Sequence, residues 1–272
     1  METLAEKHEP DSQATTSSWS GFLTREGEPV PECSWVDWCA LMARGQEQDD
    51  ISPLQAVETA GFSMAMVLRF ALGHTASGGV LSVFAADSFF GWTAVAAARH
   101  LLNAGCELRV LLPQFTTDFS PLFTQLLTPL DQRGATLYGW SSPEWGEIHG
   151  VVESSHAVLC GLADAQRVIA PFHNSFAIQM NESRVPVHCV GAPLGLSPEV
   201  TPGVGEKLFA SSTLSIGVPL ASLKNGSDMI GRHYLCDAGW SSNDYAQLGF
   251  TGRPFFCEQP VIQLKTPPEP EE

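Results

Sequence analysis

Apolar residues recur every three or four positions between residues 51 and 73, a spacing that predicts an amphipathic helix. The positions that follow this spacing are Leu54, Val57, Gly61, Met64, Leu68 and Leu72. Ser52 with Gln55 three residues later fits a capping box, and Pro53 suits the first helical position. Gly73 is typical of the residue that closes a helix. Both ends of this helix are therefore predicted.

Short apolar runs alternate with helical patterns along the rest of the chain. The predicted strands are residues 78–86, 106–113, 136–140, 156–162, 185–193, 213–219 and 232–239. The predicted helices between them are residues 91–105, 117–134, 143–154 and 171–180. Because the strands are apolar throughout rather than alternating, they indicate a sheet that is covered on both faces. The pattern predicts an α/β fold, a Rossmann-like three-layer α/β/α sandwich with a mostly parallel sheet.

The two ends of the chain carry little that a core can bury. Residues 1–30 are polar and are expected to be a flexible segment. Residues 31–258 form a continuous globular pattern and are expected to be a single domain. Residues 259–272 are expected to be an acidic, proline-rich tail.

Charge and cysteine usage restrict the partners and the compartment. The chain of 272 residues has 14 basic and 30 acidic residues, a formal net charge of -16. This balance disfavours nucleic acid and anionic membranes as partners. The seven cysteines are scattered and include no C-x-x-C pair, and the N-terminus has no secretion-signal pattern, which favours a cytoplasmic protein.

In a doubly wound sheet, ligands bind beyond the carboxyl ends of the strands, so reactive groups are expected in the loops there. The loop at residues 86–92, "ADSFFGW", stands where a phosphate-binding turn would need small residues, and it offers only Gly91. Phe89, Phe90 and Trp92 are bulky. Two interpretations stay open: the aromatic side chains belong to the core while Asp87 and Ser88 cap a helix, or they form a platform for a flat ligand.

The other two loops are poor in reactive groups. Cys160 ends a buried strand, where a cysteine commonly serves as a small apolar filler, and Asp164 lies in the loop after it. The third loop, "VGAPLGLSPE", has no ionisable side chain before Glu199. Asp87, Cys160 and Asp164 are thus weak catalytic candidates, and the histidine spacing predicts no dedicated metal site.

The order of these segments resembles the YjeF N-terminal domain family over residues 50 to 245. The resemblance rests on "AAARHLLNAG" and "VPVHCVGAPLGL". Members of this family include NAD(P)H-hydrate epimerases, which interconvert the epimers of hydrated nicotinamide cofactors and bind potassium. The resemblance therefore implies a cofactor site at Ser88, Phe89, Phe90, Gly91, Trp92, Gly191 and Leu194.

The residues at those positions depart from the family pattern. Where epimerases read N-N-G-G-D-G, residues 89–94 read "FFGWTA". Cys160 stands in place of a potassium-binding aspartate, Gly191 in place of the aspartate near the substrate, and Leu194 in place of the serine near the ion. A glycine and a leucine can neither accept nor donate a proton, and the side chains of a phenylalanine, a cysteine and a leucine offer no oxygen ligand to a monovalent cation. We therefore expect degenerate potassium and cofactor sites, and no bound cofactor.

Two functions follow as hypotheses. The first is a catalytically inactive relative that acts as a binding or scaffold module. Such a module is expected to form a homodimer, or to bind a protein partner or a small aromatic ligand. The alternative is an active epimerase, or another small-molecule enzyme that uses a rebuilt site. A further question concerns residues 34–42, where Trp35, Trp38 and Leu41 form one face of a short helix. That face either packs on its own domain or binds a partner.

Overall fold

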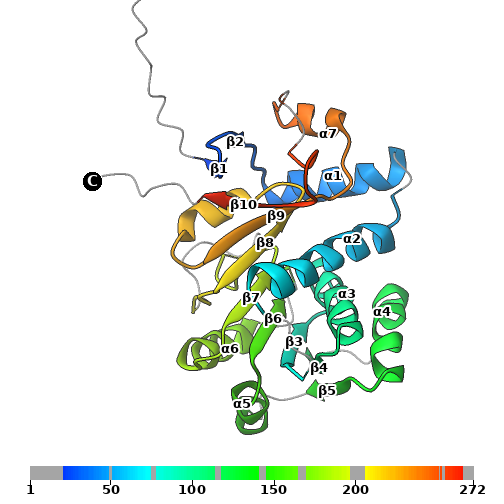
Figure 1. Ribbon diagram of the computed structural model, residues 1–272, viewed down its shortest axis with the longest axis vertical. Helices are drawn as coiled ribbons and strands as arrows, with labels where there is room; N and C mark the ends of the chain where they lie inside the picture. The colour runs from blue at the N-terminus through cyan, green and yellow to red at the C-terminus, as the bar shows by residue number, and fades with distance from the viewer. Residues whose placement is uncertain are drawn as a thin grey trace, which may run out of the picture.

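The computed structural model describes residues 21–48, 51–74, 78–113, 118–140, 145–164, 170–196, 206–250, 252 and 255–265. Its centre is a ten-stranded sheet in the order β2-β1-β10-β9-β8-β7-β6-β3-β4-β5 (Figure 1). The seven strands from β9 to β5 are parallel, and β10, β1 and β2 extend the sheet in antiparallel fashion. The predicted α/β sandwich with a mostly parallel sheet is confirmed.

The parallel strands coincide with the apolar runs of the sequence. They are β3 (Val80–Ala85), β4 (Glu107–Pro113), β5 (Thr136–Trp140), β6 (Ala157–Gly161), β7 (Val187–Val190), β8 (Ser212–Ile216) and β9 (Arg232–Cys236). Every residue of β6, β7 and β8 is buried, as expected of strands covered on both faces.

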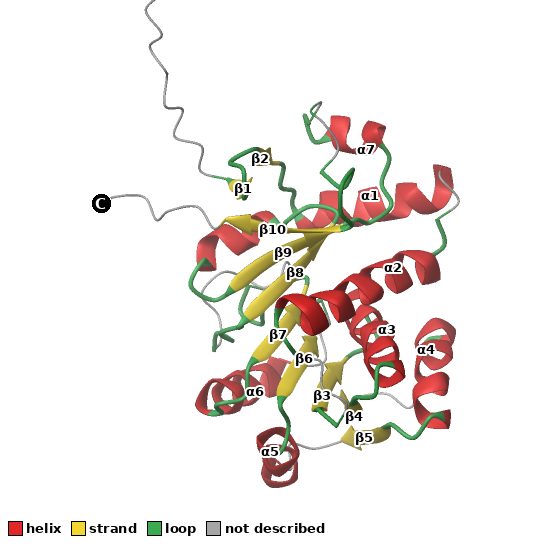
Figure 2. Ribbon diagram, in the orientation of Figure 1, coloured by secondary structure: helices red, strands yellow, loops and turns green. Residues whose placement is uncertain are grey.

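Helices form the two outer layers (Figure 2). On one side lie α2 (Pro53–Met66) with its π-helical extension η1 (Val67–Ala71), α3 (Phe89–Asn103) and α4 (Pro121–Gln132). On the other side lie α5 (Trp145–Glu153) and α6 (Ala170–Glu182). The helix α1 (Trp35–Gln48), the short 3₁₀ helix η2 (Ala221–Gly226) and α7 (Ser242–Gln247) complete the set of described helices.

The predicted start of α2 is observed in detail. Ser52 Oγ accepts a hydrogen bond from Gln55 N, the Gln55 side chain accepts one from Ser52 N, and Pro53 is the first helical residue. Gly61 lies where α2 meets α3, and a Cβ there would come within 2.5 Å of Ala96 Cβ. The glycine therefore permits the two helices to pack closely against each other.

The predicted boundaries at both ends are wrong for the segments that form strands. β1 (Phe22–Thr24) and β2 (Pro29–Val30) lie within residues 1–30, and β10 (Val261–Lys265) lies within the predicted tail. The side chains of Phe22 and Val30 are fully buried, so this hairpin belongs to the folded domain. β1, β2 and β10 have only three, two and five residues, which explains why the sequence pattern did not reveal them. Residues 1–20 and 266–272 lie outside the described residues.

Candidate functional site

The carboxyl ends of β3, β6 and β7 meet at one edge of the sheet, because these strands are parallel neighbours. The first turn of α3 begins there with Ser88 as its N-cap residue. The resemblance implies a cofactor site at residues 88–92 and at Gly191, which directly follows β7. The structure brings these residues together. This edge is the candidate site.

Phe90 points into the candidate site and fills part of it. Its side chain is 1 % exposed. Its ring lies against the small space above Gly191, so that a Cβ built on Gly191 would be 2.1 Å from two ring carbons. On its other side the ring contacts Trp35 and Trp38 of α1, with centroid separations of 5.6 and 5.7 Å. Of the two open interpretations, core packing is the one that describes Phe90.

Phe89 and Trp92 extend the same packing toward the surface. The Phe89 ring meets the Trp38 ring edge-on, with a centroid separation of 5.2 Å. The ring centroids of Trp92 and Phe89 are 6.4 Å apart. Both side chains are half-buried and pack against the core. We refer to Trp35, Trp38, Phe89, Phe90 and Trp92 as the aromatic cluster.

Helix α1 supplies two members of the aromatic cluster. Trp38 is 3 % exposed, stacks on Trp35 at 5.2 Å and donates a hydrogen bond from Nε1 to the carbonyl of Ile216 at the end of β8. The apolar face at residues 34–42 therefore packs on its own domain. Its spacing in the sequence signalled the buried face, but which loop that face contacts depends on the tertiary structure.

Two glycines allow α3 to approach the strand ends. A Cβ on Gly91 would lie 1.9 Å from the carbonyl oxygen of Ala86, and one on Gly161 would lie 2.3 Å from that of Phe90. Close backbone approach thus requires glycine at both positions. The one glycine of the first loop has a packing role in this structure.

Asp164 occupies the N-terminus of α3, the place where a phosphate binds in many α/β proteins. Its carboxylate accepts hydrogen bonds from Ser88 Oγ at 2.7 Å and from the backbone N–H of Phe90 at 2.9 Å. Burial raises the pKa of Asp164 to about 6, and these hydrogen bonds offset part of that rise. The helix terminus therefore already holds an anionic group from its own chain.

Asp87, which precedes Ser88 in the first loop, also accepts hydrogen bonds. Its carboxylate accepts hydrogen bonds from Trp92 Nε1 at 2.6 Å and from Ser120 Oγ at 2.7 Å. Ser120 is the N-cap residue of α4, so Asp87 ties the start of α3 to the start of α4. Asp87 and Asp164 flank Ser88 but bond to different partners.

Cys160 lies within the sheet rather than in an open loop. It is 1 % exposed and is the register partner of Cys189 on the neighbouring strand β7. A hydrogen bond with Cys160, together with burial, raises the pKa of the Cys189 thiol well above its ordinary value. The Cys189 thiol therefore stays protonated, which makes it a poor nucleophile. Cys160 itself is closed off from solvent by its burial in the sheet.

Leu194 and Gly191 shape the third loop through apolar packing and backbone conformation. Gly191 has a φ of 75° and donates its N–H to Leu214 O at 2.8 Å. Leu194 is fully buried, and its carbonyl accepts a hydrogen bond from Leu208 N. These residues close the carboxyl edge next to Phe90.

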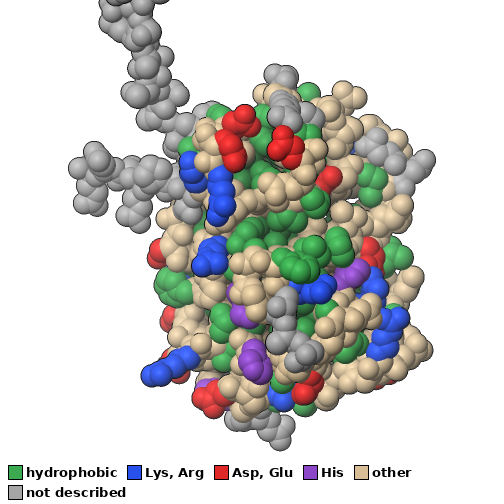
Figure 3. All heavy atoms as spheres, viewed as in Figure 1, with side chains coloured by type: hydrophobic (Ala, Val, Ile, Leu, Met, Phe, Trp, Pro, Cys, Tyr) green, Lys and Arg blue, Asp and Glu red, His purple; other side chains and the backbone are tan. Residues whose placement is uncertain are grey.

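A cavity lies at the antiparallel edge of the sheet. A cavity of about 190 Å³ there is lined by residues that include Glu26, Glu28, Glu258, Phe255 and Ile262. Figure 3 shows acidic side chains gathered at the top of the molecule, around the β1–β2 hairpin. The cavity lies on the antiparallel extension, away from the three loops, and contributes nothing to the site at the strand ends.

Within the described ranges, no three His, Cys, Asp or Glu side chains gather in a way that would hold a metal ion. In the same ranges, no helix is both long enough and apolar enough to cross a membrane.

Comparison with known proteins supports the fold. No family model matches the sequence, and no curated protein matches it. The crystal structure of yeast YNL200c, a YjeF N-terminal domain, is 18% identical, covers 85% of this chain and 99% of its own, and gives a TM-score of 0.67. At this identity the likeness shows the fold alone. The fold expected from the YjeF resemblance is therefore confirmed.

More distant solved structures share only parts of the architecture. An NAD-dependent alcohol dehydrogenase is 15% identical over 72% of this chain and 46% of its own, with a TM-score of 0.37. A dipicolinate synthase chain from Bacillus halodurans is 14% identical over 54% of this chain and 41% of its own, with a TM-score of 0.33. Likenesses this weak carry no argument about function.

Proposed function

We propose that this chain is a YjeF N-terminal domain whose cofactor site is closed, and that it acts as a binding or scaffold module instead of an NAD(P)H-hydrate epimerase. The observation that carries the proposal is the position of Phe90. Its ring stands between Gly191 and the two tryptophans of α1, at the strand ends where the resemblance implies the nicotinamide cofactor.

The chemistry of the neighbouring side chains supports the same conclusion. Epimerisation at a carbon that bears a hydroxyl group requires a proton acceptor and donor at the ring face. Gly191 and Leu194 offer neither. The side chains of Cys160 and Leu194 also lack the oxygen atoms that a potassium ion requires, and both are buried in apolar surroundings.

Charge at the helix terminus works against a dinucleotide. A pyrophosphate is favoured at a helix N-terminus by unpaired N–H groups and the helix dipole. In α3 the Asp164 carboxylate accepts the N–H of Phe90 and adds a negative charge of its own. A dinucleotide phosphate at this terminus would have to displace the carboxylate, with electrostatic repulsion adding to the cost.

The alternative, a rebuilt enzyme site, is favoured by one observation. A pKa of about 6 gives Asp164 a value suited to acid and base catalysis near neutral pH. Its hydrogen bonds to Ser88 and Phe90 support a capping role in preference to this one.

As a scaffold, the module is expected to act in the cytoplasm, as a homodimer or with a protein partner. A small aromatic ligand is the other kind of complement that we propose for the module. The net charge of -16 disfavours nucleic acid and anionic membranes as partners.

The proposal is tested by incubating the protein with one epimer of hydrated NADH in the presence of potassium and following the appearance of the other epimer. We expect the spontaneous rate and no more. Light scattering on the same preparation is expected to give a mass that rises with concentration toward that of a dimer. Acceleration of the interconversion that is lost in Asp164→Asn would contradict the closed site and support the rebuilt enzyme.

A further inference from the structure

The outer face of α2 and η1 presents large apolar side chains to solvent. Phe62 is 47 % exposed and Phe70 is 64 % exposed. Met66 lies between them, four residues from each, and is half-buried. Because residues four apart are neighbours on a helix surface, these three side chains form one line, which we call the α2 stripe. The closed cofactor site gives the α2 stripe no role.

Elsewhere on the described surface, large apolar side chains are exposed on separate parts of the chain. They are Val36, Tyr138, Ile178 and Phe209, each from a different element or loop. Single exposed apolar residues are normal on a protein surface, whereas a group of them marks an interaction site. Figure 3 shows hydrophobic side chains gathered over the C-terminal half of α2.

The inner face of α2 is apolar as well. Ala60, Gly61 and Met64 are buried there. Within the 14 residues of α2 the single charged side chain is Glu58. A helix that is apolar on all sides is normally buried on all sides. The outer face is therefore expected to be covered when the protein functions.

Polar side chains of α2 and α3 border the α2 stripe and neutralise one another. The Glu58 carboxylate accepts a hydrogen bond from Arg99 and lies 3.2 Å from His100 Nε2. The His100 ring meets the Phe62 ring edge-on, with a centroid separation of 5.3 Å. Burial, together with the charge of Arg99, lowers the pKa of His100, so this ring is neutral near pH 7. This border therefore has no net charge.

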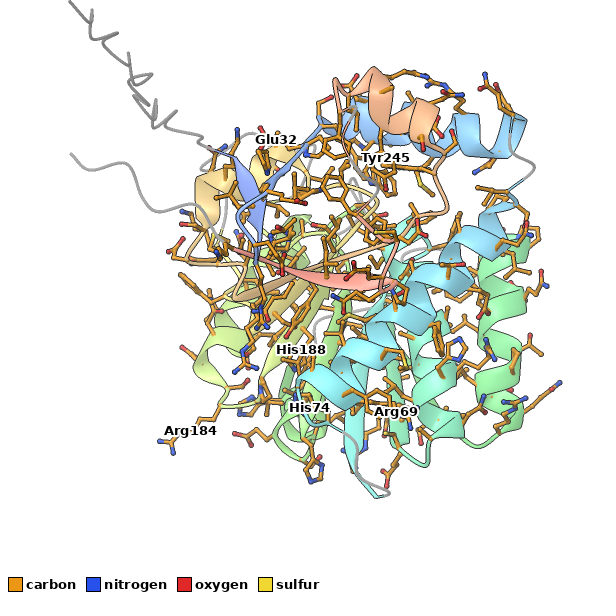
Figure 4. The ribbon with its side chains drawn as sticks, turned by 45° about the horizontal axis from the view of Figure 1, so that its top comes forward. Glu32, Arg69, His74, Arg184, His188 and Tyr245 are labelled. Atoms are coloured by element: carbon orange, nitrogen blue, oxygen red, sulfur yellow. The ribbon has the colours of Figure 1, made fainter. Side chains whose placement is uncertain are left out.

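The far end of the α2 stripe carries a cation. The Arg69 guanidinium of η1 lies over the Phe70 ring, 4.8 Å from its centroid, and Figure 4 labels this side chain. Phenylalanine, methionine and arginine are the residue types enriched at protein–protein interfaces, while aspartate, glutamate and lysine are depleted there. The composition of this face is therefore that of a protein–protein interface.

We propose that the α2 stripe is the surface through which two copies of this chain form a homodimer, an inference that rests on the proposed scaffold function. Charge is the first argument for a second copy. Two chains of net charge -16 repel each other, so they need a contact face where acidic groups are neutralised. The α2 stripe meets this need, because Glu58 is paired with Arg99.

Symmetry is the second argument for a second copy. In a twofold dimer the same patch must be complementary to itself. Phe62 and Phe70 are equally spaced on either side of Met66. A twofold axis at Met66 would thus place Phe62 of one copy opposite Phe70 of the other. α2 is about 21 Å long and about 10 Å wide, which is less than the ~800 Å² per partner of a standard interface. We therefore expect a weak dimer that dissociates on dilution.

The test is sedimentation equilibrium of the full chain over about two decades of concentration. Phe70→Glu places an unpaired charge in the proposed contact, so we expect it to raise the dimer dissociation constant at least about tenfold. Phe209→Glu is the matched control, because Phe209 is 50 % exposed, lies in the loop before β8 and gains the same charge. This control is expected to leave the dissociation constant unchanged.

Cross-linking gives a second reading that does not depend on the Phe70→Glu variant. Met66→Cys is made after the exposed Cys39 and Cys257 are replaced by serine. A short bismaleimide, in which each maleimide double bond adds one thiol, is expected to join two chains because residue 66 lies on the proposed axis. Phe209→Cys in the same background is expected to stay uncoupled.

Thermal unfolding shows that Phe70→Glu is folded, and its melting temperature is expected to match that of the parent because Phe70 is exposed. A parent that is monomeric at every concentration would overturn the proposal. So would a Phe70→Glu variant that dimerises as well as Phe209→Glu, or equal cross-linking of Met66→Cys and Phe209→Cys. Each of these results leaves the closed cofactor site standing, since the epimerisation assay tests that site separately.

Discussion

The ring of Phe90 stands directly over Gly191, so close that a Cβ on the glycine would lie 2.1 Å from the Cε2 and Cζ atoms of the ring. Phe90 lies in the first turn of α3 and Gly191 directly follows β7, and the two residues are 101 positions apart in the sequence. A large side chain in the first loop is thus matched by the absence of a side chain in the third. Their fit closes the carboxyl edge of the sheet.

Gly191→Ala is expected to destabilise the protein strongly. A residue with a Cβ at positive φ costs about 1–2 kcal/mol. Overpacking against Phe90 adds about 1–3 kcal/mol. The measurement is the free energy of unfolding in urea. Gly150→Ala in α5 is the control, because a Cβ at Gly150 meets no atom within 4 Å. If the clash with Phe90 is real, adding Phe90→Ala will cost less in the Gly191→Ala background than in the parent protein.

Phe90→Ala is expected to cost about 3–5 kcal/mol in the free energy of unfolding, as for other buried phenylalanines. It also leaves an apolar cavity lined by aromatic rings, which small aromatic molecules can enter. We expect indole to raise the melting temperature of this variant but not that of the parent protein. An equal effect of indole on both proteins would show that a pocket already exists beside Phe90.

Asp164→Asn is expected to remove part of the pH dependence of stability. Burial raises the pKa of Asp164 to about 6, above its ordinary value of 3.8, so the folded state favours the protonated form. The stabilisation from this group is full below pH 3.8 and is lost as the pH rises through about 6. Urea denaturation from about pH 3.5 to about pH 7.5 is the measurement, since this range spans both pKa values. Parallel curves for the parent and the variant would rule out a raised pKa at Asp164.

Trp38→Phe is expected to loosen the attachment of α1 to the site. The change removes the hydrogen bond from Nε1 to Ile216 O, which keeps its hydrogen bond from Val218 N, at a cost of about 0.5–1.5 kcal/mol. Hydrogen exchange of the α1 amides should become faster. Val36→Ala on the same helix is the control, because Val36 is 74 % exposed and should change stability by less than about 0.5 kcal/mol. Similar exchange in both variants would contradict an anchoring role for Trp38.

Much of the fold was predictable because the parallel strands are continuous apolar runs with helices between them. The capping box at Ser52 and Gln55 is a local signal, and its prediction is confirmed. The hairpin of β1 and β2 was missed because its strands have only three and two residues. β1 pairs with β10, which lies more than 200 positions away in the sequence, and β2 pairs with β1.

The candidate site was predictable in composition but not in geometry. Three aromatic residues in the first loop suggested that a phosphate turn had been filled. The sequence did not reveal that Trp35 and Trp38 complete the packing, because that contact depends on how α1 crosses the strand ends. The sequence places Asp164 in the loop after a strand but does not reveal its partner, the N-terminus of α3 on another part of the chain.

The closed site is tested most directly by saturation-transfer NMR of hydrated NADH with the parent protein in potassium buffer. With Phe90 over Gly191 and Asp164 at the start of α3, we predict no transfer to the nicotinamide protons. Saturable transfer to those protons, competed by hydrated NADPH, would contradict the account and show that the cofactor still enters this edge of the sheet.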